Sequence, residues 1–171
     1  MASRREIDPF AARHLPPAEQ WPTFRFELPE LQFPERLNCA VELLDRAVLE
    51  KGWGDRVAIR TPRATLTYRD LLEEANRIAN VLVDDLGLRP GNRVLLHGPN
   101  TATLAAAWFG IVKAGGIVVA TMPLLRAREL ATIADLAEVS HALVDASVAA
   151  EFQGALELTP HLRRQAYFHL P

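Results

Sequence analysis

The sequence contains one cysteine, Cys39, so it cannot form a disulfide within the chain. A reducing, cytoplasmic setting fits this composition. Neither sign of charge is in large excess, because 19 Lys and Arg stand against 21 Asp and Glu. This balance gives no electrostatic reason to expect a nucleic acid or an anionic membrane surface as a partner. The amino terminus, MASRREIDPF, carries charges where a signal peptide would need an apolar segment.

Long hydrophobic runs are also missing. The longest stretch of low charge, residues 94–112, is interrupted by Gly98, Pro99 and Asn100. These residues divide it into a strand and a helix, and each part is too short to cross a bilayer. We therefore predict no membrane span.

The common motifs of catalytic and metal sites are absent. Gly110 and Gly115 have the spacing of a phosphate-binding loop, but no lysine follows them to neutralise the phosphates. The five histidines and the single cysteine show no metal-ligand spacing. Ser140 precedes a histidine but has no flanking glycine, so it does not form a nucleophile elbow. We name no catalytic residue and expect no metal site.

The most informative stretch is residues 93–120. Apolar runs at 94–96 and 117–120 are typical of strands that are buried on both faces. Residues 102–114 lie between them and are apolar on nearly every side, which predicts a helix buried all round. Two strands joined by such a helix form a right-handed βαβ unit. We expect this unit at the centre of the fold.

Two helices and a hairpin are predicted before this unit. Asn38 caps a helix that ends near Gly52. Short β-like runs at 56–60 and 65–67 predict a hairpin. Thr67, with Asp70 three residues later, begins an amphipathic helix that ends at Gly87. Cys39, in the first turn of the first helix, is expected to be a small buried hydrophobe.

Alternating elements continue to the end of the sequence. We predict a helix over 127–137, an apolar strand at 142–144, a short helix over 147–156 that Ser147 caps, and a last strand over 162–170 at an edge of the sheet. Repeated strand–helix–strand order is typical of an α/β fold with a doubly wound, mostly parallel sheet. The body is expected to comprise residues 39–171.

Residues 1–38 differ in composition from the body. They contain six prolines, which disfavour regular structure, and five aromatic residues, which are uncommon in disordered tails. We predict an extended strap whose rings pack on the body. A partner-binding arm is the alternative.

Ligands of doubly wound sheets collect beyond the carboxyl ends of the strands. His97 lies at such a position, although a histidine bonded to a loop carbonyl would explain it equally. Arg126 and Arg128 begin a helix, where the helix dipole disfavours cations, and an anion between them would remove this conflict. Exposure to solvent is the simpler explanation. Asp145 ends a strand, and we interpret it as the cap of the following helix.

Two blocks resemble a known family. LTYRDL (residues 66–71) is similar to the first core motif of acyl-adenylate-forming enzymes, and VKAGGIVV (residues 112–119) is similar to the second. The resemblance extends over residues 38–145. Residues 28–38 and 122–127 resemble the aryl-acid branch, which comprises benzoate–CoA and 2-aminobenzoate–CoA ligases. The fold is then the incomplete amino-terminal subdomain of such a ligase.

The resemblance implies activation of an aromatic carboxylic acid with ATP and Mg²⁺, followed by transfer to coenzyme A. The family's reactive motifs have no counterpart in this sequence. We therefore expect the chain to be inactive alone, to bind none of these cofactors alone, and to need the missing remainder of the enzyme as a partner. Two alternatives are a non-catalytic interaction module derived from this subdomain and an unrelated doubly wound nucleotide-binding domain.

Overall fold

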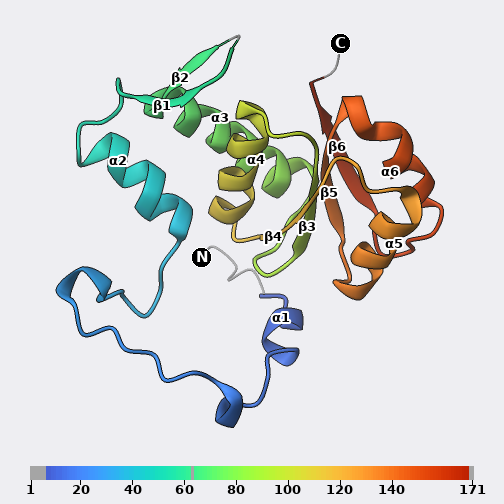
Figure 1. Cartoon of the computed structure of the whole chain (residues 1–171), viewed down its shortest axis with the longest axis horizontal. Coiled ribbons are helices and arrows are strands. Elements are labelled where there is room, and N and C mark those ends of the chain that lie inside the picture. Colours follow the sequence, from blue (N-terminus) through green and yellow to red (C-terminus); the bar gives the residue numbers. More distant parts are fainter. Residues whose placement is uncertain (1–6, 63, 170–171) are drawn as a thin grey trace.

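The computed structural model describes residues 7–62 and 64–169. Four parallel strands form one sheet in the order β4-β3-β5-β6 (Figure 1). Their bounds are β3 Arg93–His97, β4 Ile117–Thr121, β5 His141–Asp145 and β6 Arg164–Phe168. A separate antiparallel hairpin pairs β1 (Val57–Arg60) with β2 (Thr65–Thr67). The predicted α/β fold and hairpin are confirmed.

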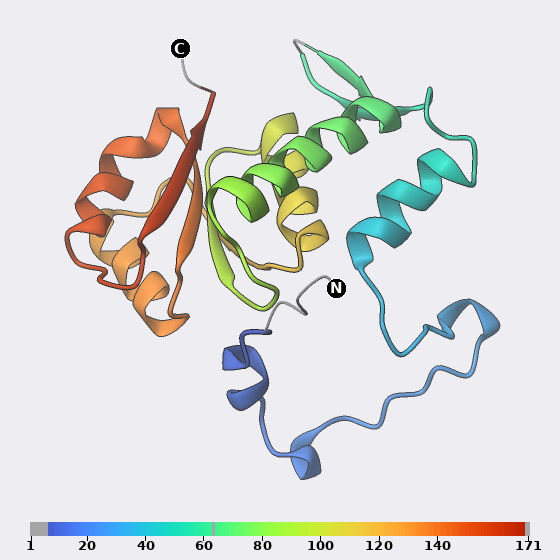
Figure 2. The ribbon, with the colours of Figure 1, turned by 180° about the vertical axis from the view of Figure 1, so that it is seen from behind.

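Two helical layers cover the two faces of the sheet (Figures 1 and 2). On one face lie α3 (Tyr68–Asn80), its π-helical extension (Val81–Asp85) and α4 (Ala102–Lys113). On the other lie α5 (Ala127–Leu136) and α6 (Ala149–Leu156), which follows a 3₁₀ turn (Ala146–Val148). The side chains of β3 alternate between the two cores. Those of Val94 and Leu96 face the first layer, and that of Leu95 faces the second.

The helix formed by a π-helical turn (Val41–Asp45) and α2 (Arg46–Leu49) packs against α3 and α4. It buries Leu44 and Val48 against Leu71 and Leu72. The predicted caps of the first two helices of the body are confirmed. The Asn38 side chain accepts from the backbone N–H of Ala40 at 3.0 Å and also donates to the carbonyl of Val112 at 3.0 Å. Thr67 and Asp70 form a reciprocal capping box, and Gly87 adopts a φ of +64° after the third helix.

The predicted central βαβ unit is only partly central. Its first strand, β3, lies inside the sheet, but its second strand, β4, is an edge strand. The helix between them is not buried all round, because 37% of Trp108 is exposed. An apolar run predicts a strand but does not say how many neighbours the strand has. In the part of the chain that the structure describes, β4 pairs with β3 alone.

The strap also differs from its prediction. It contains three short helices, α1 (Phe10–Arg13) and the 3₁₀ turns Ala18–Gln20 and Pro29–Leu31. Between α1 and α2 the chain forms a loop that stands away from the body (Figure 2). Its rings are exposed and contact one another: Phe24 stacks on Phe26, which meets Phe33 edge to face. The prediction that the rings pack on the body is wrong for these three residues, whose rings contact one another instead.

Cys39 is exposed, so the prediction of a buried thiol is also wrong. The next residue, Ala40, and Leu44 occupy the buried face of the helix instead. Among the helices described, none combines the length and apolar character of a transmembrane span.

Candidate functional site

A groove lies at the carboxyl ends of β3 and β5. The chain leaves β3 toward α4 on one face of the sheet and leaves β5 toward α6 on the other. Neighbouring strands whose connections diverge in this way leave a crevice, the usual ligand position in doubly wound sheets. The volume of the groove is about 760 Å³, and it is lined by Thr61, Pro62, Ala64, Leu66, Glu74, Pro99, Asn100, Thr101, Ala102, Thr103, Asp145, Ser147 and His169.

Three side chains form a hydrogen-bonded row along this groove. The Nδ1 atom of His169 lies 2.7 Å from Oδ2 of Asp145, and its Nε2 atom lies 2.9 Å from Oγ1 of Thr103. Because a carboxylate only accepts, Nδ1 carries a proton and donates to Asp145, and in the neutral imidazole Nε2 accepts the threonine hydroxyl. The carboxylate thereby fixes the tautomer and orientation of the imidazole. His169 adopts a φ of +54°, which is uncommon for a residue with a side chain.

Asp145 is the best-satisfied member of the row. Its side chain is 3% exposed and accepts from the backbone N–H and the hydroxyl of Ser147 at 2.9 and 2.6 Å. Burial raises the pKa of Asp145, but the bonds from Ser147 and His169 outweigh this effect and hold the pKa below its ordinary value. The interpretation of Asp145 as a cap is confirmed, whereas Ser147, which we expected to cap the helix, donates to this cap.

The pKa of Asp145 predicts how stability depends on pH. A carboxyl group whose pKa is lower in the folded protein stabilises the fold above its unfolded pKa of about 3.9 and loses this contribution as the pH falls through the folded value. We expect Asp145→Asn to lose part of its stability at pH 7 but to show a smaller further loss between about pH 5 and pH 3 than the wild type. Urea unfolding at several pH values measures this. Parallel curves for the two proteins would contradict it.

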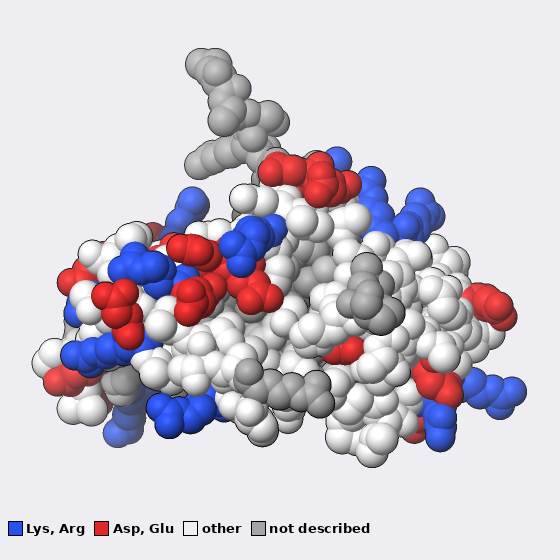
Figure 3. Space-filling view, turned by 90° about the horizontal axis from the view of Figure 1, so that it is seen from above, with Lys and Arg blue, Asp and Glu red and all other residues white. Residues whose placement is uncertain are grey.

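The charge of the groove is unsuitable for a polyphosphate. The described residues that line it include the carboxylates of Glu74 and Asp145 but neither lysine nor arginine. Figure 3 shows a face on which Lys, Arg, Asp and Glu gather mainly toward the α2 and hairpin end, while its middle is largely uncharged. Among the described residues, no three His, Cys, Asp or Glu side chains are grouped to hold a metal ion. The residues present therefore do not fit ATP with its Mg²⁺ unless other polypeptide supplies the cations.

His97, a predicted ligand-facing residue, is fully buried and does not line the groove. Its Nδ1 atom lies 2.9 Å from the hydroxyl of Thr121, and its Nε2 atom has no partner among the described residues. Burial lowers the pKa of His97, which favours the neutral imidazole. The hydroxyl of Thr121 donates to the carbonyl of Leu96 at 3.3 Å, so Nδ1 donates to Thr121 and the orphaned Nε2 atom is a hydrogen-bond acceptor. A role toward a ligand stays a prediction.

Arg126 and Arg128 lie at the start of α5, away from the groove. The guanidinium of Arg126 pairs with Glu151 at 2.8 Å. The carboxylate of Glu129 accepts from the backbone N–H of Arg126 at 2.9 Å. Two carboxylates of the chain thus supply the negative charge that this helix start favours. Arg128 is exposed. Binding of an anion by these arginines also stays a prediction.

Sequence reasoning missed Thr103 and His169. They are 66 residues apart, and neither belongs to a recognisable motif. Only the pairing of β5 with β6, which places the end of one strand beside the end of the other, brings His169 to Asp145.

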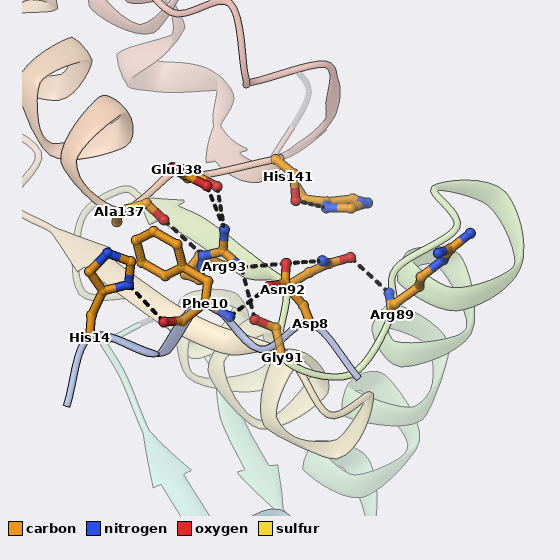
Figure 4. Close-up of polar contacts among 11 residues, drawn as sticks. Asp8, Phe10, His14, Arg89, Gly91, Asn92, Arg93, Ala137, Glu138 and His141 are labelled. Carbon is orange, nitrogen blue, oxygen red and sulfur yellow. Dashed lines mark hydrogen bonds and ion pairs between the residues drawn. The ribbon is translucent and has the colours of Figure 1, made fainter. Parts of the chain in front are cut away.

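A dense polar cluster lies at the opposite end of the strands, where the start of the chain meets the first residue of β3 (Figure 4). Arg93 is 6% exposed and pairs with Asp8 at 2.5 Å. Its guanidinium also donates to the carbonyls of Ala137 and Glu138 at 2.8 and 2.9 Å and lies 4.2 Å from the ring centre of Phe10. We call these contacts the Arg93 clasp. Its groups satisfy one another, which indicates a structural role rather than a ligand site.

Comparison with known proteins places these features in context. A sequence model of a family described as "AMP-binding enzyme" matches residues 44–167. A long-chain-fatty-acid–CoA ligase of Salmonella typhimurium is 38% identical over 97 residues, which are 57% of this chain and 17% of that protein. A salicyl-AMP ligase / salicyl-S-ArCP synthetase of Mycobacterium tuberculosis is 39% identical over 105 residues, 58% of this chain and 18% of that protein.

A solved structure also resembles this chain. The anthranilate CoA ligase AuaEII, solved with anthranoyl-AMP, superposes with a TM-score of 0.73 and 28% identity over 80% of this chain and 26% of that one. The chain therefore spans about a sixth of the curated relatives' length and about a quarter of that solved structure.

Proposed function

This chain belongs to the AMP-binding enzyme family, and we propose that it forms the amino-terminal part of an AMP-forming acid–CoA ligase that acts on an aromatic carboxylic acid in the cytoplasm. The observation that carries this proposal is the superposition on the anthranilate ligase, which includes most of this chain but only a quarter of the ligase. The family match also removes the alternative of an unrelated nucleotide-binding domain. The division into a strap, residues 1–38, and a body, residues 39–171, is part of the proposal.

The complete enzyme would use ATP, Mg²⁺ and coenzyme A. This chain would contribute the floor of the site and the hydrogen-bonded row of Thr103, His169 and Asp145. The cations that a polyphosphate needs would come from elsewhere, because the described residues lining the groove contribute only carboxylates as fixed charges. We therefore propose that the chain alone is inactive.

Calorimetric titration of the chain with ATP and Mg²⁺ tests this part of the proposal. We expect no heat of binding, since the groove would place the triphosphate against Glu74 and Asp145. Micromolar binding of ATP to the isolated chain would contradict the proposal.

A pair of chimeras tests the activity and the aryl branch. The chain replaces the matching segment in the anthranilate ligase and, as the control, in the Salmonella fatty-acid ligase. We expect release of pyrophosphate with 2-aminobenzoate from the first chimera and little release with a fatty acid from the second. A first chimera that folds but is inactive would overturn the ligase assignment, whereas equal activity of both would overturn the aryl branch.

A non-catalytic interaction module is a second candidate function. The exposed rings of Phe24, Phe26 and Phe33 favour it, because monomeric proteins rarely leave large apolar patches uncovered. A folded but inactive first chimera is the result that this candidate expects.

A further inference from the structure

The row of Thr103, His169 and Asp145 has the order of groups that activates a hydroxyl as a nucleophile. The hydroxyl lies 2.9 Å from one nitrogen of the imidazole, and the carboxylate lies 2.7 Å from the other. At these distances an imidazole can take the proton of a hydroxyl while a carboxylate holds the ring. The three residues come from α4, the end of β6 and the end of β5, so the fold rather than a local motif assembles them.

The Thr103 hydroxyl is the one placed to react with a substrate. Thr103 and His169 line the groove of about 760 Å³, and 43% of the His169 side chain is exposed. Ser147 also lines the groove, but its hydroxyl donates to Asp145 at 2.6 Å, and among the described residues no histidine is hydrogen-bonded to it. Thr103 therefore has a base beside it, and Ser147 does not.

Close packing holds the row in place. Gly98 lies between β3 and α4, and a Cβ atom there would lie 2.8 Å from Cβ of Asp145 and 3.5 Å from the ring of Phe168. The loop, Asp145 and the end of β6 thus approach more closely than a residue with a Cβ atom would allow. The φ of +54° at His169 is a conformation of the kind that clusters at functional sites.

The start of α4 supplies hydrogen-bond donors beside the nucleophile. The first backbone N–H groups of a helix have no carbonyl partner within it. The side chain of Thr101 accepts from the N–H of Leu104 at 3.1 Å, but the N–H groups of Ala102 and Thr103 donate to no other described residue. Such donors stabilise the oxyanion that forms when a hydroxyl attacks a carbonyl carbon.

The walls of the groove indicate the class of substrate. Its fixed charges among the described residues are the carboxylates of Glu74 and Asp145, which would repel a phosphate-bearing substrate. The rest of the lining is largely apolar and suits an uncharged acyl group: Pro62, Ala64, Leu66, Pro99 and Ala102.

We propose that this chain hydrolyses neutral carboxylic esters, with Thr103 as the nucleophile, His169 as the general base and acid, and Asp145 as the residue that positions His169. The Thr103 oxygen forms a bond to the ester carbonyl carbon while its proton passes to Nε2 of His169. The ester C–O bond then breaks, and the leaving group takes this proton and departs as an alcohol. Water, deprotonated by the same nitrogen, attacks the acyl-threonine, the bond to the Thr103 oxygen breaks, and the proton returns to that oxygen.

Hydrolysis of p-nitrophenyl butyrate by the chain tests this proposal. The reaction needs neither ATP nor coenzyme A, so its outcome is independent of the proposed function and of the expectation that the chain alone is inactive as a ligase. We expect kcat/KM to fall at least ~100-fold in Thr103→Val and in His169→Ala, and to persist in Thr103→Ser, which keeps the hydroxyl. Added imidazole should restore part of the rate of His169→Ala, and circular dichroism verifies the fold of each variant.

His161→Ala is the matched control. His161 is 47% exposed and also lies beside a carboxylate, that of Asp135 at 3.5 Å, but among the described residues it bonds no hydroxyl. Its removal should leave the rate unchanged. Mass spectrometry after reaction with p-nitrophenyl trimethylacetate, which deacylates slowly, should locate the acyl group on Thr103. A wild type that does not hydrolyse the ester, an equal loss in His161→Ala, or an acyl group on another residue would overturn the proposal.

Two further measurements test the role of Asp145 and the substrate class. Asp145→Asn keeps the shape of the groove but not the acceptor that fixes the imidazole, so kcat should fall while KM changes little. A rise in KM alone would overturn the positioning role. The neutral thioester S-butyryl-N-acetylcysteamine should react at least ~10-fold faster than butyryl-CoA, whose phosphates meet Glu74 and Asp145. Equal rates would overturn the preference for neutral substrates.

Discussion

Replacement of Arg93 by alanine should lower the free energy of unfolding by about 3–5 kcal/mol, the loss typical of breaking a buried ion pair. The change removes the charge beside Asp8 and leaves the carbonyls of Ala137 and Glu138 without their donor. It also removes the cation from the face of Phe10. Urea unfolding followed by circular dichroism measures the loss.

Arg89→Ala is the matched control, because Arg89 is exposed and close to the same cluster (Figure 4). A loss for Arg93→Ala no larger than for this control would show that the clasp contributes little. If Arg93→Ala does not fold, Asp8→Asn removes the charge and keeps the shape, and we expect a loss of about 1–2 kcal/mol. Partial burial raises the pKa of Asp8, but hydrogen bonds from Phe10, Arg93 and Asn92 hold it below its ordinary value. The cost of Asp8→Asn should therefore diminish below about pH 4.

Gly91→Ala should have the second large effect. Gly91 has a φ of +84°, and a Cβ atom there would lie 2.4 Å from the backbone oxygen of Asp8. The backbone strain alone costs about 1–2 kcal/mol, and the overlap should add about 1–3 kcal/mol or displace the start of the chain from β3. Urea unfolding measures the total, and the rate of proteolysis near α1 reports displacement.

Gly52→Ala separates the two contributions. Gly52 has a similar φ of +66°, but nothing lies within 4 Å of the position of its missing Cβ atom. It should therefore show only the cost of the backbone. Equal losses for the two variants would mean that Asp8 does not pack tightly against Gly91.

Local signals predicted most elements of the fold. The apolar run at β3 indicated a strand buried on both faces, the apolar run at β5 indicated a strand, and Thr67 with Asp70 identified the start of α3, because these signals lie within a few residues. The neighbours of each strand were beyond such signals. The apolar run of β4 resembles that of β3, yet only β3 lies inside the sheet.

The candidate site was less predictable for the same reason. Asp145 could be found because it ends an apolar run, and the structure places it in the groove. His169 and Thr103 could not, since a single hydrogen bond joins residues that are far apart in sequence. The aromatic content of the strap predicted that its rings make contacts, but composition does not say which residues the rings contact. Here the rings contact one another.

The loop formed by the strap tethers one side of the Arg93 clasp to the body. The segment that carries Asp8 and Phe10 is joined to the body through exposed residues 15–37. While this linker is intact, the segment meets β3 at an effective concentration on the order of millimolar, whatever the dilution of the protein. A single cut in the linker by a protease would turn the same contact into a bimolecular equilibrium, and the freed peptide would then dissociate as the sample is diluted.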